Sequence, residues 1–279
     1  MATFGSTTFD PTLSVLQSLG AAARRMDLLA AGVSRRRLAA AVAEGRVVLA
    51  GHGVYYALPG ADPMAIHLAT HQGVKACFSV AAARGLWCIR DPETPHIAVA
   101  HGRSVPGCVV HRHKGPLGLL DVLRQCIRCG TEVEALAVVE SAVVLKETSI
   151  STLRAAFTGL GGAAGRRILD MLDPQSMSII ETVARYHLRR AGYSVHSQVA
   201  VRGMGHLDLM VEGILGIELD GEAYHNNAKA FEEDLRRGNV LVIRGIPTLR
   251  ITGAMVLFHP EVMLGWVRAA LETYRSAQG

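Results

Sequence analysis

The clearest hydrophobic pattern in the chain lies between residues 205 and 221, where two short apolar runs flank a Glu-Gly pair. Apolar runs on either side of a tight turn predict a β-hairpin. Asp208 falls in the first run, and Glu218 and Asp220 end the second. Because side chains alternate along a strand, Glu218 and Asp220 share one face, which the turn can bring to Asp208. We therefore expect three carboxylates on one side of the hairpin.

Helical and strand patterns surround this hairpin. Ser178 followed by Glu181 is a capping-box pattern that begins a helix. A helical run over 228–243 places Asp234 and Arg237 three residues apart, and hence on one face. A further strand (247–252) and a closing helix from Pro260 complete the order helix, three strands, helix, strand, helix. The pattern predicts a C-terminal αβββαβ domain over 176–279.

The N-terminal 60 residues have a different pattern. Two short helical runs, 13–19 and 25–31, precede a third helix over 35–44, for which Ser34 is the expected cap. Two β-like runs follow at 46–50 and 53–58. Three helices and a two-stranded wing predict a winged helix-turn-helix over 1–60. The third helix begins with Arg35, Arg36 and Arg37, where a recognition helix would meet DNA; the alternative is a solvated helix face.

The middle of the chain is less informative. Its apolar patterns predict a small α/β middle domain over 61–157, with helices at 65–71, 79–86 and 132–145 and strands at 96–100 and 108–112. The glycine-rich stretch 158–175 is expected to be a linker, although 154–172 can still hold helical turns. The expected fold class is thus a multidomain α+β or α/β chain.

Composition and charge restrict the setting. No run approaches the roughly 20 apolar residues of a membrane span, and the N-terminal pattern is not that of a secretory signal. Five cysteines, an odd count, favour reduced thiols and a cytoplasmic location. The formal net charge is +5, and residues 1–59 carry six basic against three acidic side chains. Such a balance permits nucleic-acid binding without demonstrating it.

One group of cysteines and histidines has partial zinc spacing. Cys126 and Cys129 are three residues apart, and His111 or His113 could complete four ligands. Against this, Cys108 and His111 should face opposite sides of a strand, and a second Cys-x-x-Cys pair is missing. Buried thiols and a polar strand edge are the preferred interpretation.

The hairpin carboxylates have a more definite chemistry. Three carboxylates on one face repel each other unless a cation lies between them, and a hard divalent ion with oxygen ligands is the simplest one. A metal held by Asp208 and Glu218 could activate water and stabilise charge during phosphodiester hydrolysis. His225 is suited to proton transfer. The alternatives are that these acids merely flank a turn and that His225 is a surface or capping histidine.

The C-terminal segment resembles the PD-(D/E)XK domains related to the very-short-patch repair endonuclease, including their uncharacterised bacterial and phage branch. The resemblance is carried by Glu181, Gln198, His206-Leu207-Asp208, Ile217-Glu218-Leu219-Asp220-Gly221, Tyr224-His225, the Asp234/Arg237 helix and Leu249-Arg250. It implies Mg²⁺-dependent (or Mn²⁺-dependent) cleavage of DNA, with Asp208 as the central metal ligand and Glu218 in the (D/E) position. It also implies supporting roles for Gln198, Asp234 and Arg237 and a catalytic role for Glu181. Read from the residues alone, the last three could be only a helix ion pair and a capping-box acid.

One departure from that family pattern concerns its lysine. Asp220 stands where the (D/E)XK lysine would be. The repair endonuclease relatives also lack this lysine and rely on histidines, one of which matches His225. The resemblance leaves open whether Asp220 binds a metal or orients His225.

The N-terminal segment resembles the winged-helix domain of abortive-infection type IV antitoxins. The matching words are Leu29-Ala30-Ala31-Gly32-Val33-Ser34-Arg35, Glu44-Gly45-Arg46-Val47-Val48 and Gly53-Val54-Tyr55. This resemblance implies DNA contact. Those antitoxins carry a similar second segment, which would extend the resemblance to about residue 150.

These patterns together predict a metal-dependent DNA endonuclease with an N-terminal DNA-binding module, in phage defence, a toxin–antitoxin-like system or repair. The alternative is a winged-helix regulator or antitoxin whose nuclease-like domain is inactive. DNA is the expected partner; RNA as substrate, a protein partner encoded nearby and a homodimer stay open.

Overall fold

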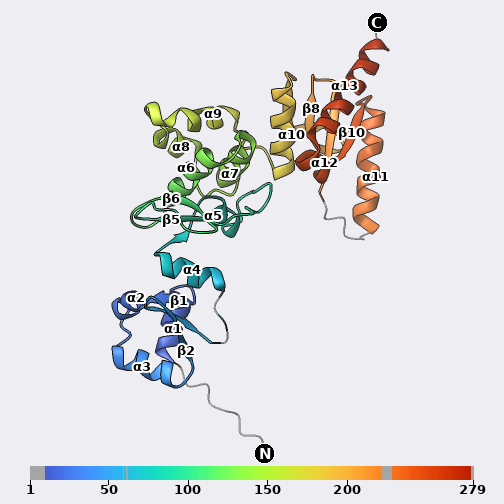
Figure 1. Cartoon of the computed structure of the whole chain (residues 1–279). Coiled ribbons are helices and arrows are strands. Elements are labelled where there is room, and N and C mark those ends of the chain that lie inside the picture. The colour runs from blue at the N-terminus through green and yellow to red at the C-terminus, as the bar shows by residue number, and fades with distance from the viewer. Residues whose placement is uncertain (1–9, 59, 61, 222–227, 278–279) are drawn as a thin grey trace, which may run out of the picture. The chain divides into compact units, whose positions relative to one another are not determined.

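The computed structural model describes residues 10–58, 60, 62–221 and 228–277 (Figure 1). The chain divides into two compact units. The first comprises Met1–Ser79 and Pro92–Leu117, and the second comprises Val80–Asp91 and Gly118–Gly279. The described residues form helices and several small sheets, as expected for a multidomain α+β chain. Within these residues, no helix combines the length and apolar character that crossing a membrane requires.

The N-terminal part of the first unit combines three helices with a small antiparallel sheet. Its elements are α1 (Pro11–Ser18), β1 (Ala22–Arg24), α2 (Arg25–Ala30), α3 (Arg35–Ala43), β2 (Val47–Gly51) and β3 (Val54–Ala57). The sheet order is β1-β3-β2. Ser34 caps α3 as expected, since its hydroxyl accepts a hydrogen bond from the Arg37 N–H at 3.2 Å. Leu16, Leu28 and Leu38 anchor the core beneath.

The remainder of the first unit contains a mixed sheet. Its elements are α4 (Pro63–His71), β4 (Val74–Lys75), the start of α5 (Cys77–Ala83), β5 (His96–Val99) and β6 (Val109–Arg112). β5 lies in the middle, antiparallel to β4 and parallel to β6. Ile97, Val99 and Val105 are buried against it.

Helices make up the first half of the second unit. They are α6 (Leu119–Cys129), α7 (Glu132–Val144), α8 (Ile150–Ala156), the 3₁₀ turn η1 (Leu160–Gly162) and α9 (Ala163–Met171). Thr131 and Glu134 form a capping box at the start of α7. Helix α9 lies inside the stretch expected to be a linker, and it buries Ile168 and Leu169.

A four-stranded sheet organises the C-terminal half of the second unit. The elements are α10 (Ile179–Arg190), β7 (Val195–Val201), β8 (Gly205–Val211), β9 (Leu215–Asp220), α11 (Ala228–Ile243), β10 (Thr248–Thr252), α12 (Gly253–Phe258) and α13 (Pro260–Ser276). The strand order is β10-β9-β8-β7, in which only the β10–β9 pair of the described strands is parallel. Glu212 and Gly213 have φ values of 55° and 66°. Positive φ at both central residues is what a type I′ hairpin turn requires, and it sets the register of β8 and β9.

Apolar side chains cover both faces of this sheet. One cluster joins the strands to α10, α12 and α13 through Leu188, Val256 and Val267. A second cluster, Val201, Met204, Leu207 and Leu241, joins α11 to the strands. Figure 1 accordingly shows α10 and α11 on opposite sides of the strands. The sheet is therefore held rigidly between helices.

A buried ion pair fastens α10 to α7 within the second unit. Arg185 donates to both carboxylate oxygens of Glu140 at 2.8 and 2.6 Å, and both side chains are almost completely buried. Thr182 and the Asp173 N–H also donate to Glu140, at 2.5 and 2.7 Å. A buried charge is tolerated only when it is paired and fully hydrogen-bonded, and this network meets that condition.

Candidate active site

The hairpin register places Asp208 beside Glu218. Leu209 pairs with Ile217 across the antiparallel β8–β9 ladder. Asp208 and Glu218 are the next residues beyond this last pair of the ladder, and strand alternation puts both side chains on the face opposite to Leu209 and Ile217. The Leu219 N–H also donates to Asp208 Oδ2 at 2.8 Å. The turn chemistry and the strand pleat thus bring together the two carboxylates that the sequence singled out.

Arg237 holds Glu218. Its Nη2 donates to the two carboxylate oxygens of Glu218 at 3.2 and 3.0 Å. The same guanidinium donates to the carbonyl oxygens of Met204 at 3.3 Å and His206 at 3.0 Å. Arg237 therefore ties α11 both to the start of β8 and to the carboxylate at the centre of the site.

Asp220 and Asp234 share Arg250. The Arg250 Nη2 and Nε donate to Asp220 at 2.7 and 3.1 Å, a two-point contact, and its Nη1 donates to Asp234 at 2.6 Å. The parallel register sets Arg250 next to Glu218. From the sequence, Arg250 is expected only as part of the family pattern. Arg250 is a basic residue in the partly buried strand β10, and this unusual position is the feature of the sequence that indicates a role in the site.

Glu181 and Gln198 form the next layer. Gln198 Nε2 donates to Glu181 Oε2 at 2.9 Å, and the Met177 N–H donates to the same oxygen at 3.0 Å. Glu181 Oε1 accepts from the Ser178 hydroxyl at 3.0 Å. Gln198 has a φ of 49°, a left-handed conformation that costs about 1–2 kcal/mol for a residue with a Cβ. Glu181 is thus both a helix-capping acid and a hydrogen-bond partner of a strained residue on β7.

The carboxyl groups of the site either have a raised pKa or form ion pairs with arginines. Burial raises the pKa of Asp208, and the nearby Glu218 and Asp220 raise it further, while the Leu219 N–H and Arg237 oppose the rise. Burial likewise raises the pKa of Glu181, with a contribution from Asp208, against its hydrogen bonds to Met177, Gln198 and Ser178. A proton or a cation at Asp208 would therefore relieve repulsion between these carboxyls.

The donor types fit a hard divalent cation, because Asp208, Glu218 and Asp220 offer only carboxylate oxygens. Their present neighbours are nevertheless guanidinium groups. Among the described residues, the His, Cys, Asp and Glu side chains whose ligand atoms all approach within 4.8 Å form a group elsewhere in the chain. Arg237 and Arg250 supply positive charge beside the carboxylates, whereas the sequence alone predicts only a metal ion in that role.

A hollow of about 440 Å³ lies beside these charged groups. Its lining includes Glu218, Asp234, Arg237 and Arg250, together with apolar side chains of α11 such as Leu241. The ion pairs described above therefore border open space.

Two sets of predicted site residues are not part of this arrangement. His225, the expected proton-transfer residue, lies outside the described residues, as does Tyr224. Arg35, Arg36 and Arg37 are exposed at the start of α3 in the first unit. Their expected contact with DNA stays a prediction.

Comparisons with known proteins add one finding. No curated protein matches the chain. A family match covers the segment from Glu181 on α10 to Leu271 on α13, and so contains every described carboxylate and arginine of the candidate site. Residues 181–271 match REase_MTES_1575, a restriction endonuclease-like family, and the C-terminal domain is therefore nuclease-like.

Proposed function

We propose that the chain is a metal-dependent DNA endonuclease with an N-terminal DNA-binding module. The observation that carries the proposal is the position of Asp208 and Glu218 next to the last paired residues of the β8–β9 hairpin, inside a segment that matches a restriction endonuclease-like family. Phage defence or a toxin–antitoxin-like setting is the proposed context, and DNA is the proposed substrate.

Asp208, Glu218 and Asp220 would hold Mg²⁺ or Mn²⁺ in this proposal. Such an ion, when bound, supplies a water of lowered pKa and a positive charge beside the scissile phosphate. Glu218 forms an ion pair with Arg237, and Asp220 forms an ion pair with Arg250. Both arginines could instead bind phosphate oxygens, because a guanidinium recognises phosphate through two parallel hydrogen bonds.

The surrounding residues have positioning roles. Gln198 and the Met177 N–H orient the Glu181 carboxyl. Glu181 also has a raised pKa, which suits a group that holds a proton near the site. His225 is the proposed proton-transfer residue by sequence position.

Cleavage of supercoiled plasmid by the purified full chain tests the proposal. Wild type with Mg²⁺ or Mn²⁺ is compared with Asp208→Asn, Glu218→Gln and Arg250→Lys, and with Glu272→Gln as a control for an exposed acid on α13. We expect metal-dependent nicking that EDTA abolishes. The two carboxylate variants should lose at least about 100-fold, because they would no longer hold the cation that stabilises the developing charge, and Glu272→Gln should match wild type.

Additional substrates decide how a negative result is read. Linear duplex DNA, single-stranded DNA and RNA are tested in parallel. Folded wild type that cleaves none of them with either metal would contradict the proposal. Cleavage that persists in both carboxylate variants would place the active site elsewhere.

A second candidate is a winged-helix regulator or antitoxin whose nuclease-like domain is inactive. The observation in its favour is that Arg237 and Arg250 already neutralise Glu218 and Asp220, so these carboxylates need no metal for stability. Sequence-specific DNA binding without cleavage, under conditions where the fold is intact, would support this function instead.

A further inference from the structure

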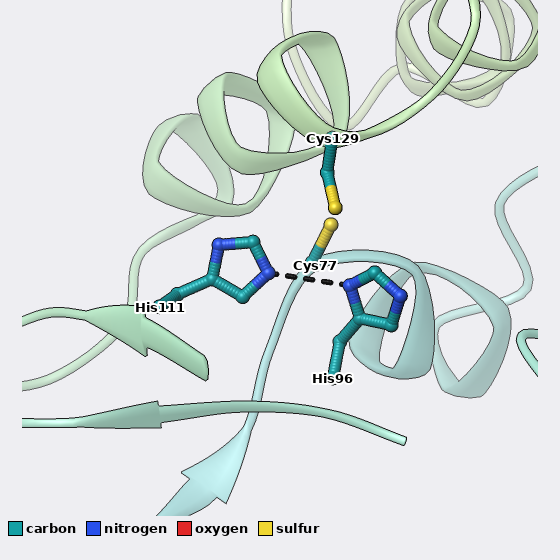
Figure 2. A group of neighbouring side chains, drawn as sticks. All are labelled: Cys77, His96, His111 and Cys129. Atoms are coloured by element: carbon teal, nitrogen blue, oxygen red, sulfur yellow. Dashed lines mark hydrogen bonds between the residues drawn. The ribbon is translucent and has the colours of Figure 1, made fainter. Parts of the chain in front are cut away.

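Side chains of the types that bind metal ions also come together in the first unit. The members of this cluster that belong to the first unit are Cys77 at the start of α5, His96 at the start of β5 and His111 in β6. Their ligand atoms all lie within 4.8 Å of one another. Figure 2 shows the two imidazole rings and the Cys77 thiol gathered around one point. Three donors from three separate elements therefore converge.

The backbone positions each donor. In the parallel β5–β6 ladder, Ala98 is paired with His111 and His96 with Val109. His96 and His111 are thus diagonal neighbours on one face of the sheet. The Ala76 N–H donates to the His96 carbonyl at 2.9 Å, and the His96 N–H donates to the Ser79 hydroxyl at 2.9 Å. Cys77 lies between these two contacts and is held beside His96.

The spacing of the donors matches tetrahedral zinc. His96 Nδ1 and His111 Nε2 are 3.2 Å apart. Two nitrogens each about 2.0–2.1 Å from a tetrahedral zinc ion lie about 3.3 Å from each other. Thiolate and imidazole are the ligands that structural zinc prefers. The nitrogen separation is therefore already that of a zinc-bound pair.

Burial and backbone strain separate this group from ordinary surface residues. Cys77 is completely buried and His96 is 9 % exposed. Cys77 also has a φ of 48°, and such strain persists only where the surrounding structure enforces it. A buried cysteine alone is an ordinary small apolar residue. Here its sulfur lies within 4.8 Å of a ring nitrogen of each of the two imidazoles.

We propose that Cys77, His96 and His111 bind a structural zinc ion that fastens α5 to the β5–β6 edge. Three protein ligands leave one tetrahedral position for a water molecule or another side chain. Figure 2 also labels Cys129, which belongs to the second unit; the proposal rests on the three residues of the first unit. This zinc site does not depend on the nuclease proposal.

The ligand set differs from the one expected from the sequence. His111 was considered there, but with Cys108, His113, Cys126 and Cys129. Among the described residues, the converging group contains neither Cys108, His113 nor Cys126. Cys77 and His96 were missed because the chain reaches them from a helix start and a strand start nineteen positions apart, without a short motif.

Metal content of the full chain tests the proposal. The protein is purified under reducing conditions, and bound zinc is measured by mass spectrometry for wild type, Cys77→Ser and His111→Gln. Cys108→Ser and His113→Gln are matched controls from the same segment. Loss of even an outer partner of a ligand typically lowers metal affinity about 10–100-fold. We therefore expect at least about a tenfold loss of zinc affinity, and hence less bound zinc after purification, in the two ligand variants and no loss in the controls.

Cobalt substitution gives an independent readout on wild type alone, should a ligand variant fail to fold. Tetrahedral Co²⁺ absorbs strongly in the visible range, and a thiolate ligand adds a near-ultraviolet charge-transfer band. Both features in wild type, with the thiolate band lost in Cys77→Ser where that variant folds, would support the site. A zinc-free wild type, an octahedral cobalt spectrum, or zinc retained in full by folded Cys77→Ser and His111→Gln would overturn it.

Discussion

At the scale of single residues, Asp208 in the candidate active site is costly to ionise. It is partly buried, it faces Glu218 across the hairpin, and only one backbone N–H of the described residues donates to it. Its pKa is raised chiefly by burial. A side chain that is unfavourable when ionised is expected where function, rather than stability, determines the residue.

The raised pKa of Asp208 leads to a stability prediction. The native state binds the Asp208 proton more tightly than the unfolded state does, so the free energy of unfolding falls as pH rises from the ordinary carboxyl range through the raised native pKa. Asp208→Asn removes the ionising carboxyl and therefore this decrease in the free energy of unfolding. In EDTA at pH 7 we expect it to raise the free energy of unfolding by about 0.5–2 kcal/mol, the usual range of a stabilising substitution.

Urea denaturation at pH 7, and at the lowest pH where the chain stays folded, checks this expectation. The gain should shrink at the lower pH, where Asp208 is protonated in both states. Glu272→Gln should show no gain at either pH. A variant that is no more stable than wild type at pH 7 would show that the Asp208 carboxylate is not under strain.

At the scale of elements, the hairpin depends on close contact between β9 and its neighbours. A Cβ built on Gly216 would lie 2.8 Å from Thr248 Oγ1 on β10 and 3.0 Å from Leu207 Cδ2 on β8. Gly216 therefore allows the strands beside Glu218 and Arg250 to approach each other. The spacing of the site is set here, two residues from its carboxylate.

Gly216→Ala should consequently destabilise the fold by about 1–3 kcal/mol, the usual effect of overpacking. Gly238→Ala is the control, because Gly238 is an exposed helix residue with nothing within 4 Å of an added Cβ. That change should be neutral or stabilising by up to about 1 kcal/mol. Denaturation midpoints of the two variants measure the difference, and equal midpoints would contradict the tight-packing argument.

Helix α3 carries the corresponding prediction for the N-terminal part. Replacing Arg35, Arg36 and Arg37 with Gln should weaken DNA binding. The slope of the logarithm of the binding constant against the logarithm of the salt concentration should also become shallower. The change should be up to about one for each phosphate contact that is lost. Fluorescence anisotropy with a DNA duplex across a salt series measures both quantities. The control is the triple variant Arg128→Gln, Arg154→Gln and Arg167→Gln, which removes three exposed charges from the second unit. If both triple variants weaken binding equally, α3 does not bind DNA specifically.

Short-range patterns explain which elements could be predicted. The β8–β9 hairpin, the Ser34 cap and the Ser178–Glu181 helix start depend on neighbouring residues, and the structure contains each of them. β1 is only three residues long and lacks β-branched residues, so it gave no signal. The sequence analysis predicts no helix at α6, although Val122, Leu123 and Cys126 are buried there at helical spacing. In the site, the carboxylate pairing was readable, but the arginine partners come from elements 16 to 30 residues away.

At the scale of the whole molecule, the Glu140–Arg185 pair determines where the chain can be divided into parts that fold separately. Sequence reasoning placed Glu140 in a middle domain and Arg185 in the nuclease-like domain, with a linker over 158–175 between them. In the structure both residues belong to the second unit, and Asp173 and Ser176 join the same buried network. No local pattern could reveal a contact between residues 45 positions apart.

Breaking this pair should be severe. Glu140→Ala leaves the Arg185 guanidinium buried without its carboxylate, which typically costs about 3–5 kcal/mol. Glu147→Ala, which removes a partly exposed ion pair with Arg84, should cost less than about 1 kcal/mol. Urea denaturation compares the two. A fragment of 118–279 should also stay soluble and folded better than one of 176–279, and the reverse order would contradict the structural role of the pair.

The hairpin also has a consequence for the order in which the site assembles. Asp208 and Glu218 are ten residues apart, so the turn at Glu212 and Gly213 can close within microseconds. Arg237 and Arg250 reach their carboxylates across 19 and 30 residues, and such distant contacts form later. During folding the carboxylates therefore meet before their counter-charges arrive. Salt that screens this early repulsion should accelerate refolding of the wild type more than that of Asp208→Asn.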